Sequence, residues 1–384
     1  MGKFIFKFIL LLGVIAGIVF GMTWYLKRQN NMEEIDKKEK DNNKIVNTNQ
    51  NKDSKAKDNL DMALVLDEKI KENAVWAGTN NLVWNEMLDK FNDGKPAESK
   101  EKNTSVDYLN KKLFTKEMVP DSYYYIKSDK MKKGLKEEIE KGIKEKFNET
   151  SNILDKIDWT EDENRYLIYS MLFRKFEFKN KFNKLENGEF KKYKNVKYFG
   201  TEGKDSKKLK DQIEIIYYIN EKDFALSINT KDGDKVVVNK NPKGESFYEI
   251  YKNILKNKKA YDTNPKTERI FNNYNFKMPN IDFTKIKSYE ELKNVTLKVK
   301  DNGEMQIEKV IQGIEFKLDE KGGRIKSETA MPMWVKSMPI EDNKKPKKLY
   351  IDDTFALFVQ KENKVPFFAL KVDDISLVQN DVHK

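Results

Sequence analysis

Residues 307–318 read IEKVIQGIEFKL, and nearer the C-terminus residues 354–360 read TFALFVQ and residues 365–372 read VPFFALKV. Runs rich in Phe, Val, Ile and Leu between polar turns are typical of β-strands. The last two runs are joined only by the polar turn KENK at 361–364. They therefore predict a buried C-terminal hairpin, and the first run predicts a strand that leads towards it.

Between the first strand and the hairpin lies a charged turn, DEKGG at 319–323, and then a polar stretch of about two dozen residues. Loops longer than about a dozen residues inside a compact domain are usually functional or disordered. This loop therefore carries our main functional hypothesis.

The composition excludes several kinds of chemistry. The chain of 384 residues has no cysteine, and its only histidine is His383, next to the C-terminus. Disulfides, cysteine nucleophiles, thiolate metal sites and catalysis by a core histidine are therefore excluded. Asp232 and Asp234 flank a glycine, but the ligand series of a calcium loop does not continue, so we interpret them as turn residues. We predict no catalytic residue, no metal site and no cofactor.

The N-terminal part predicts a membrane anchor. Phe4 to Leu26 is almost wholly apolar, and 23 residues at ~1.5 Å each match a hydrocarbon core of ~30 Å. We expect residues 1–28 to be a single-pass transmembrane helix, with a cleaved signal peptide as the alternative. Residues 29–60 are rich in Asn, Lys, Asp and Glu, which predicts a disordered linker. Residues 61–384 then form the extracytoplasmic domain.

The net charge of +11 suits an anionic partner surface. No aromatic-basic interleaving or glycine-rich loop accompanies it, so we expect no nucleic acid partner.

The domain itself predicts a mixed α+β fold. Hydrophobic spacing predicts helices over 62–70, over 81–91 and around Leu135–Phe147. Strands are expected within 164–183 and over 212–219, 224–228 and 236–238, with a turn at Asp232-Gly233. Ser246 and Glu249 predict a capping box at the start of a further helix, whose apolar face would be Phe247, Ile250, Ile254 and Leu255.

Four segments resemble the serpins, a family of serine-protease inhibitors. LDEKGGRIKSETAMPMWVKSMP at 318–339, followed by DDTFALFVQKENKVPFFALKV at 352–372, is similar to the serpin hinge, reactive loop and C-terminal hairpin. The other three occur in the family's order: NRYLIYSMLFRKFEFKNKFN at 164–183, VVVNKNPKGESFYEIYKNIL at 236–255 and YNFKMPNIDFTKIKSYEEL at 274–292. The resemblance implies a large, predominantly antiparallel central sheet with helices and a C-terminal β-hairpin.

The resemblance also implies a site. Serpins expose a bait loop and trap the protease when the loop inserts into a sheet. Counting from the hinge residue Glu320, the bait bond falls between Lys336 and Ser337, and a Lys at this place suits a trypsin-like protease. As an inserted strand the loop would alternate, so that one side is small or apolar and the other largely charged. The hinge residues of interest are Glu320, Gly322, Gly323, Ile325, Ser327 and Thr329. In an inserted strand, one side would hold Gly323, Ile325, Ser327, Thr329 and Met331, and the other would hold Arg324, Lys326, Glu328 and Ala330.

Such an inhibitor is not an enzyme, but other hypotheses stay open. One is a non-inhibitory, serpin-like surface protein that binds anionic wall polymers or a protein partner. Another is an exposed loop that no partner recognises. A hydrolase that uses carboxylates or Ser/Lys lacks any nucleophile motif in this sequence. The sequence specifies neither the target protease nor the oligomeric state.

Overall fold

A computed structural model of the chain describes residues 59–264, 273–325, 346–362 and 364–383. The predicted anchor, residues 29–58 of the predicted linker and residues 326–345 of the predicted bait loop lie outside these ranges. Leu60, which we placed in the linker, is buried in the main core. Among the described residues, no helix combines the length and the apolar character needed to cross a membrane.

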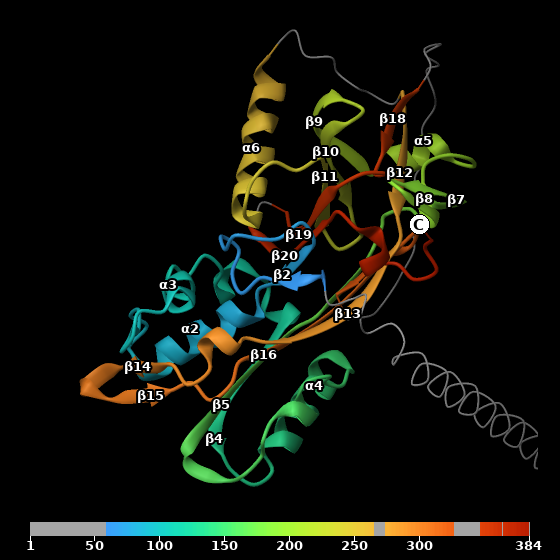
Figure 1. The fold of residues 1–384 in the computed structure, drawn as a ribbon. Helices are drawn as coiled ribbons and strands as arrows, with labels where there is room; N and C mark the ends of the chain where they lie inside the picture. Colours follow the sequence, from blue (N-terminus) through green and yellow to red (C-terminus); the bar gives the residue numbers. More distant parts are fainter. Residues whose placement is uncertain (1–58, 265–272, 326–345, 363, 384) are drawn as a thin grey trace, which may run out of the picture. The chain divides into compact units, whose positions relative to one another are not determined.

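The predicted C-terminal hairpin is present, and it lies in the largest sheet of the described residues (Figure 1). The order of this seven-stranded sheet is β1 (Asp61–Met62), β2 (Ala74–Ala77), β20 (Pro366–Val372), β19 (Phe355–Lys361), β11 (Asp234–Lys240), β10 (Asp223–Asn229) and β9 (Ile213–Asn220). All neighbours are antiparallel except β1 and β2. Leu357 and Leu370, which are paired across the hairpin, are both fully buried. The hairpin therefore forms the centre of the main core.

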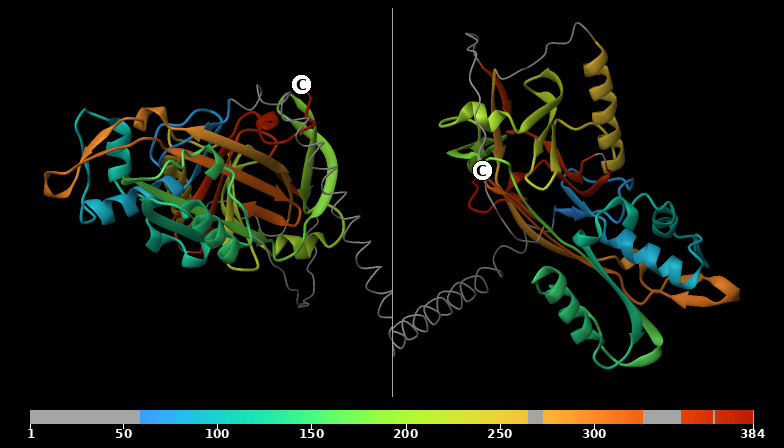
Figure 2. Two further views of the ribbon diagram at one scale, coloured as in Figure 1. Left: turned by 90° about the horizontal axis from the view of Figure 1, so that it is seen from below. Right: turned by 180° about the vertical axis from the view of Figure 1, so that it is seen from behind.

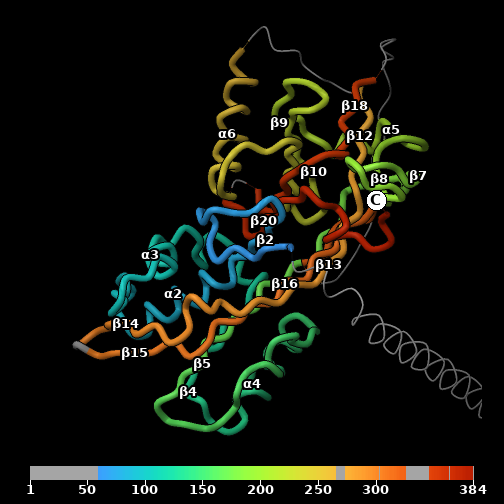
Figure 3. The backbone as a smooth tube through the Cα atoms, viewed as in Figure 1, coloured from blue at the N-terminus to red at the C-terminus, as the bar shows by residue number. Residues whose placement is uncertain are grey.

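A second sheet, here called the hinge sheet, contains the turn that precedes the loop. Its order is β13 (Ile281–Ser288), β16 (Ile311–Asp319), β17 (Gly322–Ile325) and β6 (Arg174–Glu177), and every pair is antiparallel. The segments around 174 and around 318 thus flank β17, one on each side. Strands β13 and β16 of this sheet run side by side in Figure 3.

Three smaller sheets complete the β-structure. Strands β18 (Lys347–Tyr350), β12 (Tyr274–Pro279), β8 (Tyr193–Gly200) and β7 (Asn183–Phe190) form one of them. The others are β15 (Glu304–Gln306), β14 (Thr296–Lys298) and β3 (Glu98–Ser99), and the long pair β4 (Tyr124–Met131) and β5 (Asp162–Leu172). The architecture is α+β with several antiparallel sheets.

Helices cover both faces of β5. The described α-helices are α2 (Thr79–Phe91), α3 (Thr104–Asn110), α4 (Leu135–Phe147), α5 (Ser206–Lys210) and α6 (Phe247–Thr263). Ile168 packs against the cluster that contains Trp84 and Met87 of α2, whereas Tyr169 packs against the cluster that contains Ile139 of α4. Successive side chains of a strand point to opposite faces, so α2 and α4 lie on opposite sides of β5 (Figure 2).

Most of the predicted elements are confirmed, including α2, α4, β5 and the strands β9 to β11. Ser246 accepts a hydrogen bond from the Glu249 amide as predicted, but the Glu249 carboxylate bonds the amide of Glu245 instead of that of Ser246. Leu255, which we placed on the apolar face, is 49% exposed.

One predicted helix is wrong, and one predicted strand begins too early. Residues 62–70 form no helix. Ala63 and Leu66 pack in the main core, whereas Leu64 and Val65 pack in the separate cluster that contains Trp84 and Met87. One helical face cannot serve two cores. Ile307 to Val310 lie outside β16, because Ile307 donates to the carbonyl of Val295 and Val310 accepts from the amide of Tyr289.

Candidate functional site

The turn before β17 is fixed to the segment 178–182, which follows β6. The amide of Phe182 donates to the Glu320 carbonyl (2.8 Å), and that of Phe178 donates to the Lys321 carbonyl (2.9 Å). The Glu320 residue is 2% exposed, and Lys181 and Lys184 approach its carboxylate to 3.6 and 3.8 Å. A buried carboxylate needs such partners. The predicted hinge residue is therefore a structural anchor for the start of the loop.

Glycine is required at both positions that follow the turn. Gly322 has φ +152°, and a Cβ there would lie 2.2 Å from the carbonyl oxygen of Phe176. A Cβ at Gly323 would lie 2.3 Å from the Phe176 ring. Neither position has room for a Cβ atom. β17 can therefore approach β6 this closely only because both residues are glycines.

β17 shows the alternation that the sequence predicts, as far as it is described. Gly323 and Ile325 are buried, whereas Arg324 lies on the other face and is partly exposed. Arg324 Nη2 donates to Glu149 Oε1 at 2.9 Å, and Glu315 Oε1 lies 4.0 Å from Nη1. The predicted Ser327, Thr329, Lys336 and Ser337 lie outside the described residues.

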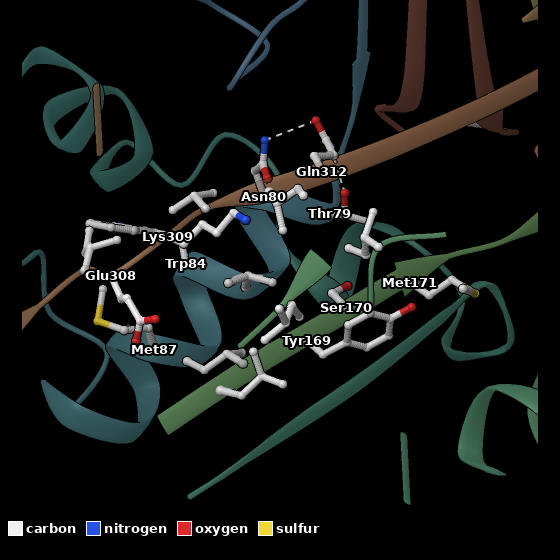
Figure 4. A pocket seen from close by; sticks show the side chains of 18 of the residues that line it. Thr79, Asn80, Trp84, Met87, Tyr169, Ser170, Met171, Glu308, Lys309 and Gln312 are labelled. Atoms are coloured by element: carbon white, nitrogen blue, oxygen red, sulfur yellow. Dashed lines mark hydrogen bonds between the residues drawn. The ribbon is translucent and has the colours of Figure 1, made fainter. Parts of the chain in front are cut away.

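A cavity of about 550 Å³ begins where the described part of β17 ends, at Ile325. One wall is β5, from Asn164 to Leu172, and the other is the chain from Glu304 to Glu315, which includes the start of β16. α2 contributes Val83, and also Trp84 and Met87, which are labelled in Figure 4. We call this space the slot. Its walls continue the two strands that flank β17 in the hinge sheet.

Polar groups line part of the slot. Gln312 of β16 accepts hydrogen bonds from Asn80 (3.2 Å) and Tyr289 (2.7 Å), and it donates to Thr79 Oγ1 (2.7 Å) and the Ala77 carbonyl (3.2 Å) (Figure 4). This network is buried and ties β16 to the start of α2. On the opposite wall, the hydroxyl of Ser170 is buried and has no hydrogen-bond partner within the part of the chain that the structure describes. An unpaired buried hydroxyl costs about 1–3 kcal/mol, so this position favours a further polar group.

A buried ion pair marks the boundary between β17 and the slot. Arg174, the register partner of Ile325, donates from Nε to Asp234 Oδ2 at 2.5 Å. The hydroxyl of Tyr123 donates to Asp234 Oδ1 at 2.9 Å. Burial raises the pKa of Asp234, although Arg174 and Tyr123 lower it in part. The sequence predicted a turn here and missed the pair, since its members lie 60 residues apart.

The described residues offer no cluster of three or more His, Cys, Asp or Glu side chains that could hold a metal ion. The arrangement is a strand, β17, already paired in a sheet, and a cavity that continues its line.

Comparisons with known proteins add the following findings. No family model and no curated protein matches the chain. The solved structures it is similar to include Serpin48, a highly specific serpin of the insect Tenebrio molitor, at 10% identity, with 79% of this chain and 92% of that chain covered and a TM-score of 0.42. They also include the thermophilic serpin Tengpin in its native state, at 12% identity, 81% and 90% coverage and a TM-score of 0.45. Human thyroxine-binding globulin in complex with its thyroid hormone matches at 15% identity, with 62% and 63% coverage and a TM-score of 0.37. Serpins, the family that the sequence resembles, are thus among the proteins to which this chain is similar.

Proposed function

We propose that this chain is a serpin-like inhibitor that traps a trypsin-like serine protease, with Lys336-Ser337 as the bait bond. One observation carries the proposal: β17 already lies as a strand between β16 and β6, and the slot continues its path between the same two walls. A loop cut at the bait bond would be free to prolong β17 into this space.

The register supports the proposal. In the strand register, Arg324 lies opposite Lys317 of β16 on one side and opposite Lys175 of β6 on the other. The same register, continued past Ile325, would bring Thr329 between Gln312 and Ser170. Directly opposed residues of antiparallel strands share a face. The hydroxyl of Thr329 would then meet the unpaired hydroxyl of Ser170.

The chemistry of trapping belongs to the protease. Its serine oxygen would bond to the carbonyl carbon of Lys336, and the bond from that carbon to the Ser337 nitrogen would break, with a proton passing to the leaving amine. Insertion of the loop would then carry the acyl-enzyme away from the geometry needed for hydrolysis. The inhibitor would supply binding and stored free energy and no catalytic group.

The first experiment nicks the full chain with limiting trypsin, maps the cut by mass and compares thermal unfolding before and after the cut. Cleavage after Lys336 should raise the melting temperature by about 10 °C or more, because the inserted strand adds hydrogen bonds and buried area. Trypsin should also form a covalent adduct that survives denaturation. The matched variant Lys336→Glu should give neither the cut nor the adduct. A cut at Lys336 with an unchanged or lower melting temperature would contradict the trapping mechanism.

We also propose that residues 4–26 anchor the domain at the outer side of a cell membrane and that 29–60 serve as its linker. The support is the apolar length of the first segment and the polar composition of the second. Protease added to intact cells should digest the domain. Protection of the domain until the cells are lysed would place it on the other side.

A second candidate function, binding of an anionic polymer, rests on how charge is distributed. Residues 179–210 hold eleven lysines and four acidic residues. The lysines of this stretch that are exposed are Lys179, Lys181, Lys184, Lys191, Lys192, Lys194, Lys197, Lys204 and Lys207. Retention of the protein on a polyphosphate column should weaken with salt. Retention should also be weaker for Lys192→Glu/Lys194→Glu and unchanged for Lys336→Glu. Equal retention of the double variant and the wild type would contradict this role.

A further inference from the structure

The slot lies between two separate hydrophobic clusters. Trp84 and Met87 of α2 belong to one cluster, Met131 of β4 and Tyr169 of β5 belong to the other, and all four residues line the slot. The slot is therefore the space that keeps the two clusters apart. An apolar occupant would contact both of them, and each Å² of apolar surface that it buries contributes roughly 25 cal/mol.

The size and the shape of the slot suit one extended chain. Its volume of about 550 Å³ falls within the range of about 300–1,000 Å³ that is usual for ligand pockets. Its lining follows β5 from Asn164 to Leu172, which at ~3.3 Å per residue is a length of roughly 30 Å. A space of this volume and length fits an extended alkyl chain better than a compact ring system.

The charged side chains that line the slot already have partners. Arg165 and Glu308 bind each other at 2.9 Å, and Arg165 Nη2 also lies 3.6 Å from Asp158 Oδ2. The other charged lining residues are Glu304, which pairs with Lys100, Glu315, which lies near Arg324, and Lys309, which is exposed and donates to the Lys156 carbonyl. Burying a charge is costly unless it is paired, so the slot favours a neutral ligand.

One polar group of the slot still lacks a partner. The hydroxyl of Ser170 is buried and unpaired within the described residues, and among the buried side-chain atoms of this kind in those ranges it is the one that lines the slot. Gln312, in contrast, already uses its carbonyl oxygen and its amide nitrogen in bonds within the protein. In Figure 4 Ser170 lies apart from Trp84 and Met87. The slot thus offers an apolar region and, away from it, one hydroxyl.

We infer that the slot binds a neutral single-chain lipid whose one polar group, a hydroxyl or a carbonyl, bonds to Ser170. The chain of the ligand extends along Trp84 and Met87 and fills the space between the two clusters. This site goes beyond the proposed function and does not rest on it, because binding is measured on the uncut chain. Under the proposed function, the ligand and an inserted strand would exclude each other, since both need the same space.

The test compares decanol with decanoate, two probes of equal chain length that differ in charge. The full chain is kept soluble by an amphipathic polymer, because the alkyl chains of a detergent could themselves enter the slot. Decanol should bind saturably in titration calorimetry and raise the melting temperature of the uncut protein. Decanoate should bind at least about tenfold more weakly, because its charge would be buried without a partner. Absence of saturable decanol binding, or equal affinity for the two probes, would overturn the inference.

A serine variant tests where the polar group of the ligand lies. Ser170→Ala should lower the affinity for decanol about fivefold, which corresponds to the loss of one hydrogen bond. The matched control is Ser227→Ala, because Ser227 is also a buried strand residue, 2% exposed, and does not line the slot. The control should bind decanol like the wild type. Equal affinity of the two variants would overturn the bond to Ser170.

A larger side chain tests where the alkyl chain lies. Val83 of α2 lines the slot, and the ring in Val83→Phe would occupy part of it, so the affinity for decanol should fall about tenfold. Leu255→Phe is the control, since Leu255 is 49% exposed on α6 and does not line the slot. If Val83→Phe does not fold, a photoactivatable decanol derivative locates the site in the wild type. It should label residues 79–91 and 164–172, and labelling confined to other segments would overturn the site.

Discussion

Two regions lie along the line of β17 and differ in what fills them. The upper half is the place of β17 itself in the hinge sheet, and the lower half is the slot that continues its line. In the upper half β17 pairs with β16 and β6, two glycines allow the close approach, and Gly323 and Ile325 are buried. In the lower half β5 and the chain before β16 enclose a cavity of about 550 Å³ and are joined by Arg165 and Glu308. Under the proposed function, the cavity is where an added strand would form further hydrogen bonds and bury further area, and that gain in free energy would drive trapping.

The largest effect is expected from filling the space that β17 needs. Gly322→Val would place a Cβ against the Phe176 carbonyl at a positive φ, so we expect a loss of about 3 kcal/mol or more in the free energy of unfolding. Gly134→Val is the matched control, because Gly134 has φ +80° with nothing within 4 Å of its Cβ position. Urea denaturation measures both. A loss no greater in Gly322→Val than in the control would mean that β17 does not depend on the close approach.

The second effect concerns the polar network of the open half. Gln312→Leu keeps the volume of the side chain but leaves Asn80, Tyr289 and Thr79 without the partner they share. We expect a loss of about 2 kcal/mol in the free energy of unfolding, because buried polar groups would be left unpaired. The control Gln306→Leu removes a single 3.5 Å bond to the Asn294 carbonyl, at an exposed site. If the two variants unfold alike, the network does not stabilise the open half.

Sequence patterns found the filled half more readily than the open one. The alternation around Gly323 and Ile325 is local, and the apolar runs of β19 and β20 are long enough to identify a buried hairpin. The serpin-like segment at 164–183 also includes β6, which pairs with β17. These signals depend on neighbours within a few residues, which a single sequence displays directly.

The rest could not be predicted because it depends on distant partners. Arg165 and Glu308 are 143 residues apart, and Arg174 and Asp234 are 60 apart. Each of these side chains resembles any other surface charge when only the sequence is seen. The wrong helix at 62–70 has the same origin, because two cores that form around distant residues divide its side chains between them.

A smaller effect is expected at the outer face of β17. Arg324→Gln removes the bond to Glu149 and the attraction of Glu315, so we expect a loss of about 1 kcal/mol that decreases with added salt. Lys317→Gln is the control, since Lys317 pairs at 3.2 Å with an Asp282 side chain that is 54% exposed. Thermal unfolding at low and high salt measures both variants. A salt-independent loss in Arg324→Gln would point to packing of the Arg324 side chain instead.

The smallest effect is a pH dependence of the free energy of unfolding, caused by Asp234 at the boundary between the two halves. Burial raises the pKa of Asp234, so between its unfolded and folded pKa values the folded state binds the proton more tightly. Stability therefore rises as the pH falls through the raised pKa and stops rising near the unfolded value. Asp234→Asn cannot titrate there, and the stability of the wild type relative to this variant should increase as the pH is lowered from 7 towards 4. Asp232→Asn removes the other carboxylate that Arg174 binds and should leave this slope in place. A relative stability that stays level or decreases would mean that Asp234 is not desolvated at this boundary, and that Arg174 holds the end of β17 by charge alone.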